Sequence, residues 1–260
     1  MRSNENIAIS TNKVLLVPYD AHHVPRYHEW MEDPAIREAT ASERLTLAEE
    51  YENQASWREA KDKLTFIICE PQQDATPEHT PVSVVASEAD EPGKMVGDIN
   101  LFLTPWDGDE DEGGDLQQGN DYVTAEVDIM IADQRHRGRG LGRAAVGTFL
   151  LYIQRNLKGL LLEYASAGTD VATGEGRRPQ AVLRELVARI NADNAGSIAL
   201  FKSLGFKQRG GVNFFGEISM VLEGFGQENV REEGHEPAWK AAVKGDGYKE
   251  VAYDRSRLGN

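Results

Sequence analysis

Residues 133–143 combine four arginines with three glycines and could bind the phosphate groups of a nucleotide-like ligand. They follow an alternating segment at 122–132 that predicts a strand, and they precede a segment at 142–158 whose apolar spacing predicts a helix. Glycine lets successive backbone N–H groups turn toward one concavity, and the start of a helix adds partial positive charge. Together these features predict a pyrophosphate-binding loop.

Other uses of a loop rich in arginine and glycine fit this sequence less well. A Walker loop ends in Gly-Lys-Ser or Gly-Lys-Thr, which is absent here, and the dinucleotide fingerprint requires a different glycine spacing. An exposed turn and an RNA-binding Arg-Gly segment stay as alternatives. The RNA-binding alternative would place such a segment, without interleaved aromatic residues, in a chain whose net charge is −15.

Two acids on the strand before this loop could move a proton. Glu126 and Asp128 alternate along 125–132 and therefore share one face of the strand, while apolar residues fill the other face. A carboxylate in such a position could serve as a general base. The alternative is that both acids face solvent, or that one of them pairs with Arg189.

We expect no metal site. His22, His23 and His28 lie close in the sequence, but at helical spacing their side chains do not converge on one point. Cys69 is the only cysteine and falls in an apolar strand, which excludes an internal disulfide and a multi-cysteine metal site.

The composition is that of a globular protein, with 40% hydrophobic and 27% charged residues in 260. A net charge of −15 repels the phosphates of nucleic acids and membranes and attracts cationic groups such as amines, although the acids could serve solubility alone. No apolar run is long enough to span a bilayer, and the first residues lack a signal peptide. We therefore expect no nucleic-acid or membrane partner, and a cytoplasmic location with the nucleus as an addition.

The rest of the sequence predicts a mixed α/β fold. Strands are expected at 13–18, 64–70, 95–103, 122–132, 182–190 and 213–222, and helices at 22–31, 46–60, 142–158 and 194–204. The spacing in 182–190 also suits a helix, and 160–164 could be a strand or the end of the preceding helix. Loops or partly disordered insertions are expected at 71–93, 105–121 and 165–180. Residues 1–223 would form one domain, followed by a charged tail at 224–260 with at most one short helix near Trp239.

Two motifs resemble those of the GNAT superfamily of acetyltransferases. Its signature, Arg/Gln-x-x-Gly-x-Gly/Ala, is matched at 137–142 and also at 135–140, and the later register leads directly into the helix. A second family element, Asn-x-x-Ser/Ala followed by Leu-Phe/Tyr-x-x-Leu-Gly-Phe, is matched at 194–206. Segments of the N-terminal half, such as 23–31 and 96–103, are similar to the N-acetyltransferase 9-like branch. The resemblance covers about 13–222 outside the insertions.

This resemblance implies a central mixed, mostly antiparallel sheet flanked by helices, in the order β-α-α-β-β-β-α-β-α-β, and acetyl-CoA as co-substrate. Tyr27 and Trp30 would lie on helices that line the acceptor groove, with a place in the helix core as the alternative. The residues that would contact acetyl-CoA are the backbone of Met130, Ile131 and Ala132, the loop residues Arg137, Gly138, Arg139, Gly140, Leu141, Gly142 and Arg143, and Asn194 with Ser197.

The implied reaction is direct acetyl transfer to a primary amine within a ternary complex, with Glu126 and then Asp128 as candidates for the base. A protein amine, at an N-terminus or a lysine in a basic segment, is the expected acceptor. The alternatives are a small amine and a weakly catalytic acetyl-CoA-binding scaffold. The scaffold is suggested by Phe201, which stands where many family members carry a tyrosine acid. The oligomeric state is not indicated.

Overall fold

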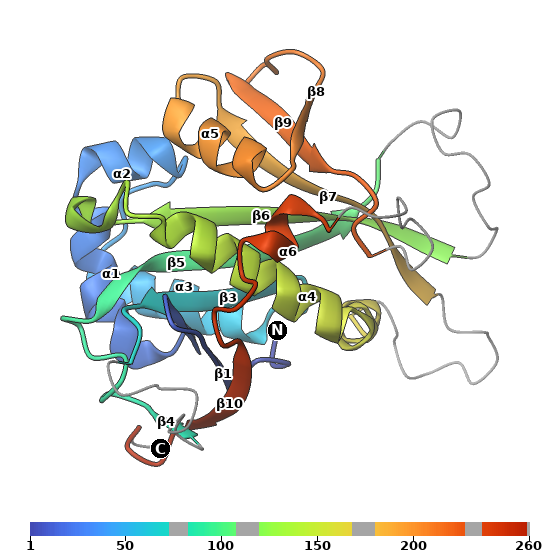
Figure 1. The fold of residues 1–260 in the computed structure, drawn as a ribbon. Coiled ribbons are helices and arrows are strands. Elements are labelled where there is room, and N and C mark those ends of the chain that lie inside the picture. Colours follow the sequence, from blue (N-terminus) through green and yellow to red (C-terminus); the bar gives the residue numbers. More distant parts are fainter. Residues whose placement is uncertain (73–82, 108–119, 168–179, 227–235, 259–260) are drawn as a thin grey trace.

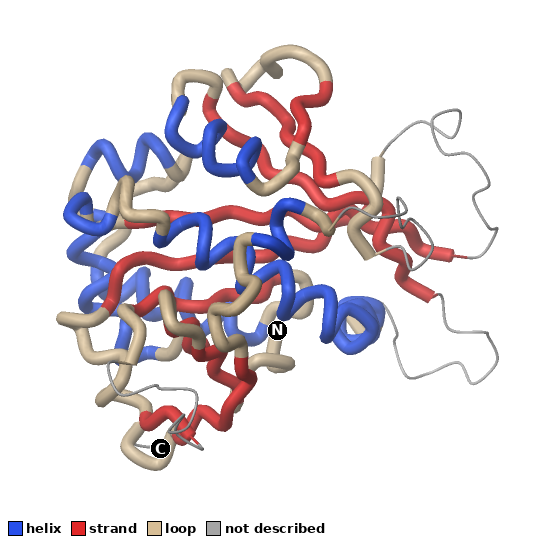
Figure 2. The backbone as a smooth tube through the Cα atoms, in the orientation of Figure 1, coloured by secondary structure: helices blue, strands red, loops and turns tan. Residues whose placement is uncertain are grey.

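The structure is a computed structural model, described here for residues 1–72, 83–107, 120–167, 180–226 and 236–258. These residues form one mixed sheet in the order β4-β10-β1-β2-β3-β5-β6-β7-β9-β8 (Figures 1 and 2). Adjacent strands are antiparallel except for the parallel pairs β6·β7 and β10·β4. The strands are β1 (Ile7–Ser10), β2 (Leu15–Pro18), β3 (Lys63–Cys69), β4 (Ser83–Val85), β5 (Met95–Pro105), β6 (Asn120–Ile131), β7 (Gln180–Asn191), β8 (Lys207–Arg209), β9 (Glu217–Leu222) and β10 (Lys249–Asp254).

Helices cover both faces of this sheet, as the mixed α/β fold requires. α1, α2 and α3 lie on one face, and the long helix α4 lies on the other with α6 beside it (Figure 1). α5 contacts β7 and β9. The helices are η1 (Ala21–His23), α1 (Val24–Met31), α2 (Pro34–Ala39), α3 (Leu47–Glu59), η3 (Gln134–His136), α4 (Leu141–Ala165), α5 (Ala195–Ser203) and α6 (Ala238–Ala241).

Helices α2 and α3 begin with side-chain caps, and α3 begins where its sequence predicts. The hydroxyl of Thr46 accepts a hydrogen bond from the backbone N–H of Glu49 (3.3 Å), and the Glu49 carboxylate accepts one from the N–H of Thr46 (2.8 Å). This reciprocal capping box begins α3. Asp33 caps α2 by accepting from the N–H of Ala35 (2.9 Å), with Pro34 in the first turn.

The two faces of the sheet carry separate apolar clusters. On the α4 face, the ring of Phe66 makes edge contacts with Phe149 (5.9 Å between centroids) and Tyr152 (5.3 Å), and all three side chains are fully buried. On the other face, Ile67 packs in a cluster with Trp30 and the first helices. Phe66 and Ile67 separate in this way because successive strand residues point to opposite faces.

The predicted tail at 224–260 is wrong for residues 236–258. The indole of Trp239, 3% exposed, packs against Phe225 at 5.5 Å, and Tyr253 is equally buried. β10 pairs with β1 on one side, where Ala252 lies opposite Ile7, and with β4 on the other. Charged residues are interspersed throughout this segment, so its widely spaced large apolar residues do not indicate that it packs into the core.

Smaller differences concern short elements and ambiguous segments. β1, β4 and β8 contain three or four residues each, too few for a clear periodicity, and β4 falls inside the loop predicted at 71–93. Residues 160–164 end α4, and 182–190 form the strand β7, which is paired on both edges. Most of the three predicted insertions lies at 73–82, 108–119 and 168–179, outside the described residues.

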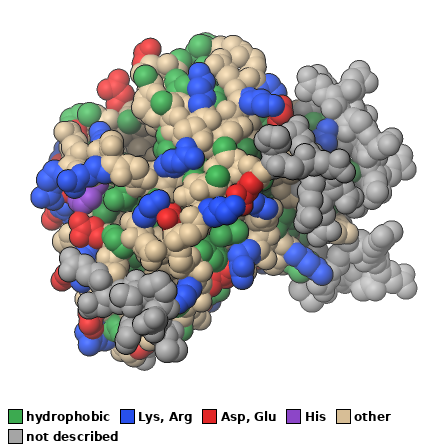
Figure 3. Space-filling view, viewed as in Figure 1, with side chains coloured by type: hydrophobic (Ala, Val, Ile, Leu, Met, Phe, Trp, Pro, Cys, Tyr) green, Lys and Arg blue, Asp and Glu red, His purple; other side chains and the backbone are tan. Residues whose placement is uncertain are grey.

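Two surface properties follow from the described residues. None of their helices combines the length and the apolar character needed to cross a membrane. On the face drawn in Figure 3, Lys and Arg side chains are scattered among apolar and acidic ones. The negative net charge therefore does not form one continuous acidic surface on that face.

Candidate active site

β6 and β7 pair only over their first halves. Their parallel register runs from Asn120 opposite Gln180 to Glu126 opposite Val187. Beyond this point β6 continues to Ile131 beside β5 alone, and β7 continues to Asn191 beside β9. The β7-facing backbone edge of residues 127–131 therefore has no strand partner in this register, and an extended ligand could pair with it. Of the predicted cofactor-binding residues, Ile131 lies on this edge, whereas the carbonyl of Met130 faces Gly97 of β5.

The loop after β6 has the geometry that its glycines predict. Gly138 (φ +69°) and Gly140 (φ +81°) have left-handed backbone conformations, and the space beside both is open. α4 begins at Leu141 without a side-chain cap, so its first N–H groups are available to an anion. The described residues therefore fit the pyrophosphate of acetyl-CoA at the start of α4, next to the unpaired edge of β6.

The arginines of this segment hold different positions. Arg137 Nε donates to the carbonyl of Ile131 (2.8 Å), which ties the loop to the end of β6. An Arg143 guanidinium N–H donates to the carbonyl of Ser203 (2.7 Å), which ties α4 to α5. Arg135 is bound to Asp133 by a hydrogen-bonded ion pair (2.6 Å). When the signature is aligned with residues 137–142, its first residue is Arg137, which lies where the loop meets the end of β6.

Asn194 has a structural task at the start of α5. Its side-chain oxygen accepts a hydrogen bond from the backbone N–H of Ser197 (3.0 Å) and caps the helix. This bond explains why the two residues occur at a fixed spacing. Their contact with acetyl-CoA stays a prediction.

Four polar side chains share the sheet face under α1 and α3. Glu126 and Asp128 project from β6, on the same face as Met130, which belongs to the cluster on the α1 side. Asn100 of β5 lies directly opposite Asp128, and Asp98 lies opposite Met130. The structure thus adds Asp98 and Asn100 to the two acids that the sequence singles out.

The three carboxyl groups differ in their surroundings. Glu126 forms an ion pair with Arg189, as one of the sequence alternatives predicts, and burial nevertheless raises its pKa. Asp128 is half-buried, and burial raises its pKa. Asp98 is 2% exposed, and burial followed by the charge of Asp128 raises its pKa to about 7. The ionisation of Asp98 therefore falls near neutral pH.

Asp98 and Asn100 were missed in the sequence, although a signal was present. They occupy alternate positions of an otherwise apolar strand, as Glu126 and Asp128 do. Polar residues on the same face of two central strands are unusual where that face is packed. The strand pairing that brings the four together could not be read from either segment alone.

α1 places its two predicted acceptor-groove residues differently. Tyr27 is half-buried between the rings of Tyr19 (5.3 Å) and Trp30 (6.0 Å), and its side chain acts to lower the pKa of Asp98. Trp30 is 5% exposed and belongs to the apolar cluster. The alternative of a core position therefore holds for Trp30, because its position on α1 turns the indole toward the sheet.

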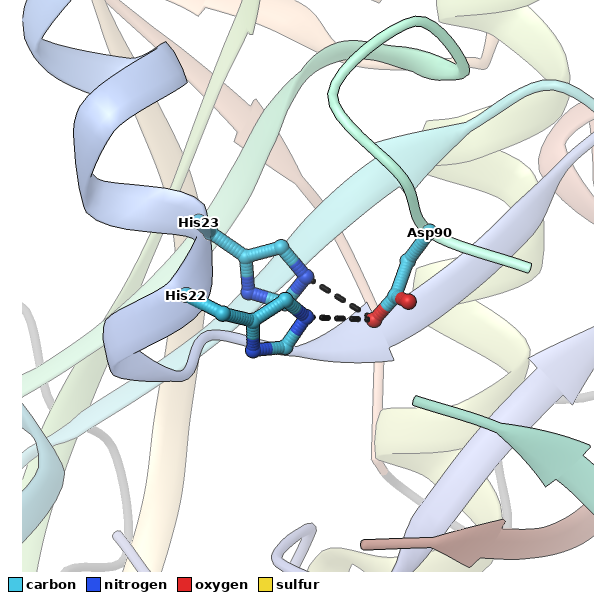
Figure 4. A group of neighbouring side chains, drawn as sticks. All are labelled: His22, His23 and Asp90. Carbon is cyan, nitrogen blue, oxygen red and sulfur yellow. Dashed lines mark hydrogen bonds and ion pairs between the residues drawn. The ribbon is translucent and has the colours of Figure 1, made fainter. Parts of the chain in front are cut away.

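A second polar group joins the first helices to β10 through Tyr253, and Figure 4 shows its members His22, His23 and Asp90. The Asp90 Oδ2 atom lies 3.1 Å from His22 Nε2 and 2.9 Å from His23 Nε2, and it also accepts a hydrogen bond from the hydroxyl of Tyr253. The other Asp90 oxygen accepts from the backbone N–H of Ser87 (2.6 Å). The prediction that the histidines do not converge is wrong for His22 and His23, because Asp90 from a distant segment supplies their common partner.

The geometry of His23 is that of a hydrogen-bond donor. Its Nδ1 atom accepts a hydrogen bond from the backbone N–H of Asp20 (3.0 Å), so its proton resides on Nε2. A protonated Nε2 donates to Asp90 and has no lone pair for a metal ion. Burial also lowers the pKa of His23, which keeps the ring neutral. We therefore assign this cluster to the attachment of β10 rather than to metal binding.

Comparison with known proteins identifies the family. Residues 13–207 match the family described as acetyltransferase (GNAT) domain. The alpha/beta-tubulin-N-acetyltransferase 9 of Drosophila melanogaster is 40% identical over 220 residues, which cover 85% of this chain and 88% of that protein. An N-acetyltransferase 9-like protein of Caenorhabditis briggsae is 36% identical, with 86% and 89% covered.

Solved structures show the same fold. The aminoglycoside acetyltransferase AAC(6')-Ib, in complex with ribostamycin and coenzyme A, superposes with a TM-score of 0.51 at 15% identity, covering 85% of this chain and 99% of that one. At this identity the similarity concerns the architecture alone.

Proposed function

The chain belongs to the GNAT acetyltransferase family and is an acetyl-CoA-dependent N-acetyltransferase, and we propose that its acceptor is a primary amine of a protein. The relation to proteins named for the acetylation of tubulin carries this proposal, because they are 36–40% identical to this chain over 85% of its length. Tubulin is accordingly the first acceptor to test.

The described residues around the strand separation would hold acetyl-CoA. The end of β6 at Met130, Ile131 and Ala132 would line its extended arm, which could pair with the backbone of Ile131 on the free edge, and the loop from Gly138 to Arg143 would bind its pyrophosphate. When bound there, acetyl-CoA supplies the acetyl group next to the polar face of β6. A backbone N–H near Ile131 would then stabilise negative charge that develops on the thioester oxygen.

The acceptor must lose its positive charge before it can attack. We favour Asp128 over Glu126 as the carboxylate in contact with the amine, because Asp128 is free of the ion pair that engages Glu126 with Arg189. The N–C bond forms as the C–S bond breaks. Of the two protons that an ammonium loses on becoming an amide, one goes to a carboxylate of this face and one ends on the departing thiolate.

Phe201 does not support a scaffold function. Its side chain is 2% exposed and packs against Phe206, with ring centroids 5.0 Å apart. A hydroxyl at this position would be enclosed in the core. Departure of the thiolate without an acid is chemically reasonable, because the pKa of a free thiol is about 8.5.

Mass spectrometry of acetylated products tests the proposed function. Purified protein and acetyl-CoA are incubated with tubulin dimers, with tubulin-derived peptides whose N-termini are free or blocked, and with polyamines. We expect acetylation of the protein and peptides above that of the polyamines. Exclusive modification of polyamines would reject the protein acceptor, and a failure of acetyl-CoA to bind in calorimetry would reject the site.

We also propose that the acceptor segment is basic and that the protein acts in the cytoplasm, where tubulin is found. The seven acids and no bases at 105–121 support the first point. Deletion of 107–119 should raise the KM for basic peptides and leave that for neutral peptides unchanged. Equal effects on both peptide classes would reject a charge-based role of this segment. Fluorescence microscopy of a tagged chain tests the proposed location in the cytoplasm.

A further inference from the structure

Buried oxygen atoms gather between the sheet and α1 without enough donors. Asp98 and Asn100 are each 2% exposed. They occupy alternate positions of β5, on the sheet face under α1 and α3. The Asn100 side-chain N–H donates to Asp98 Oδ2 (2.8 Å). Asp98 Oδ1 and Asn100 Oδ1 are buried and have no hydrogen-bond partner among the described residues.

Two buried acceptors without donors are costly, so their presence calls for an explanation. Asn100 is directly opposite Asp128, and Asp98 is its diagonal neighbour on the same face. The three oxygen-bearing side chains thus lie next to one another over the two strands. A primary ammonium group carries three N–H donors and one positive charge, which is what such a set of acceptors lacks.

The other ionisable groups near this position reinforce the preference for a cation. Glu126 and Asp128 face it from β6, Tyr27 from α1, Glu50 from α3, and Tyr19 from the segment after β2. Arg189 is engaged by Glu126. Within the described chain, the charge that acts on Asp98 is the negative charge of Asp128.

We propose that Asp98 accepts the proton of the acceptor ammonium, in a pocket completed by Asn100 and Asp128. The ammonium enters past the half-buried Asp128 and Tyr27 and donates to Asp98 Oδ1, Asn100 Oδ1 and the Asp128 carboxylate. One N–H bond then breaks and its proton moves to Asp98, which leaves a neutral amine whose electron pair can attack. Asp98 later returns the proton to solvent. This inference rests on the proposed function and specifies which residue receives the proton there.

The chemistry of Asp98 suits this role. Its pKa of about 7 leaves the carboxylate substantially ionised at neutral pH and makes it a stronger base than an ordinary aspartate. Asn100 fixes one oxygen of the carboxylate and leaves the other directed at the ligand position. Asp98 and Asn100 thus provide both a base and its orientation.

The test compares Asp98→Asn, Asp98→Glu and Asp128→Asn with the unmodified protein on one acceptor peptide between about pH 6 and 10. The same Asp-to-Asn change at the exposed Asp62 serves as the control. We expect Asp98→Asn to lower kcat by about 10²–10⁴-fold at neutral pH. The deficit should shrink at high pH, and on a peptide whose acceptor amine is acidified by a neighbouring fluorine, because both supply neutral amine without a base. Asp98→Glu should restore part of the activity.

The outcomes separate this inference from the proposed function. Acetyl-CoA binding measured by calorimetry should be equal in all variants, since Asp98 lies on the acceptor side. A wild-type kcat in Asp98→Asn, or a deficit that neither pH nor the acidified amine reduces, would overturn the role of Asp98 while acetylation by the unmodified protein stands. An unmodified protein that acetylates no peptide or tubulin overturns the proposed function and this inference with it.

Discussion

The two faces of the central sheet differ in the polar groups that they bury. Under α4, Phe66, Phe149 and Tyr152 are fully buried and make edge-to-face ring contacts. Under α1 and α3, Asp98 and Asn100 are equally buried, with oxygens that lack partners. The first face supplies stability, and the second carries groups that lower it. The same strands can therefore hold a reactive site because their other side is packed tightly.

Removing a ring from the stabilising face should give the largest effect. Phe149→Ala should lower the free energy of unfolding by about 3–5 kcal/mol, because it removes a fully buried ring and leaves a cavity. Denaturant unfolding followed by circular dichroism measures this change. A loss below about 1 kcal/mol would contradict the assignment of stability to the α4 face.

A substitution on the face under α1 and α3 should instead raise the free energy of unfolding. The pKa of Asp98, about 7 in the fold, lies above the value of about 3.9 in an unfolded chain. The contribution of this group to stability is therefore complete below about pH 4 and is lost as the pH rises to about 7. Asp98→Asn removes this loss and should raise the free energy of unfolding by about 2–4 kcal/mol at pH 8.

Thermal unfolding of Asp98→Asn at several pH values checks this sign. The difference in Tm from the unmodified protein should grow between about pH 4 and 7 and then stay constant. A variant that is less stable at pH 8 would show that the carboxylate stabilises the fold.

A smaller effect should come from the contact between α4 and the C-terminal segment. A Cβ atom on Gly147 would lie 2.9 Å from a methyl group of Val243 and 3.2 Å from the carbonyl oxygen of Trp239. Gly147→Ala should therefore displace α6 and lower the free energy of unfolding by about 1 kcal/mol, despite the higher helix propensity of alanine. Gly159→Ala in the same helix, where the added atom meets open space, is the matched control and should be neutral or stabilising.

The smallest effect on stability is expected at Glu126. Its partner Arg189 is 39% exposed, and ion pairs accessible to solvent contribute about 0–1 kcal/mol. Glu126→Gln should therefore change the free energy of unfolding by less than about 1 kcal/mol, and it should lower kcat less than Asp128→Asn does. A larger kcat loss in Glu126→Gln would return Glu126 to first place as the base.

The sequence was informative where function depends on consecutive residues. The loop at 133–143 could be predicted because its glycines and arginines act within one short segment between a strand and a helix. The start of α3 at Thr46 could be predicted for the same reason, since its cap bonds a residue three positions away.

Contacts between segments that lie far apart in the chain could not be predicted from the sequence. Asp98 becomes notable only when β5 is paired with β6, and His22 and His23 only when Asp90 is placed beside them. The sequence of β10 resembles a tail because its partners β1 and β4 lie far away in the chain. Pairing register is a property of the whole sheet, and local periodicity does not contain it.

The pairing of β10 with β1 has a consequence for biosynthesis. Ile7 is translated about 245 residues before its partner Ala252. At about 5–20 residues per second, a ribosome leaves one edge of β1 unpaired for roughly 12–50 seconds. During that time β1 offers a free strand edge to chaperones or to other nascent chains. This edge of β1 is therefore protected from pairing with other chains only after β10 has been synthesised.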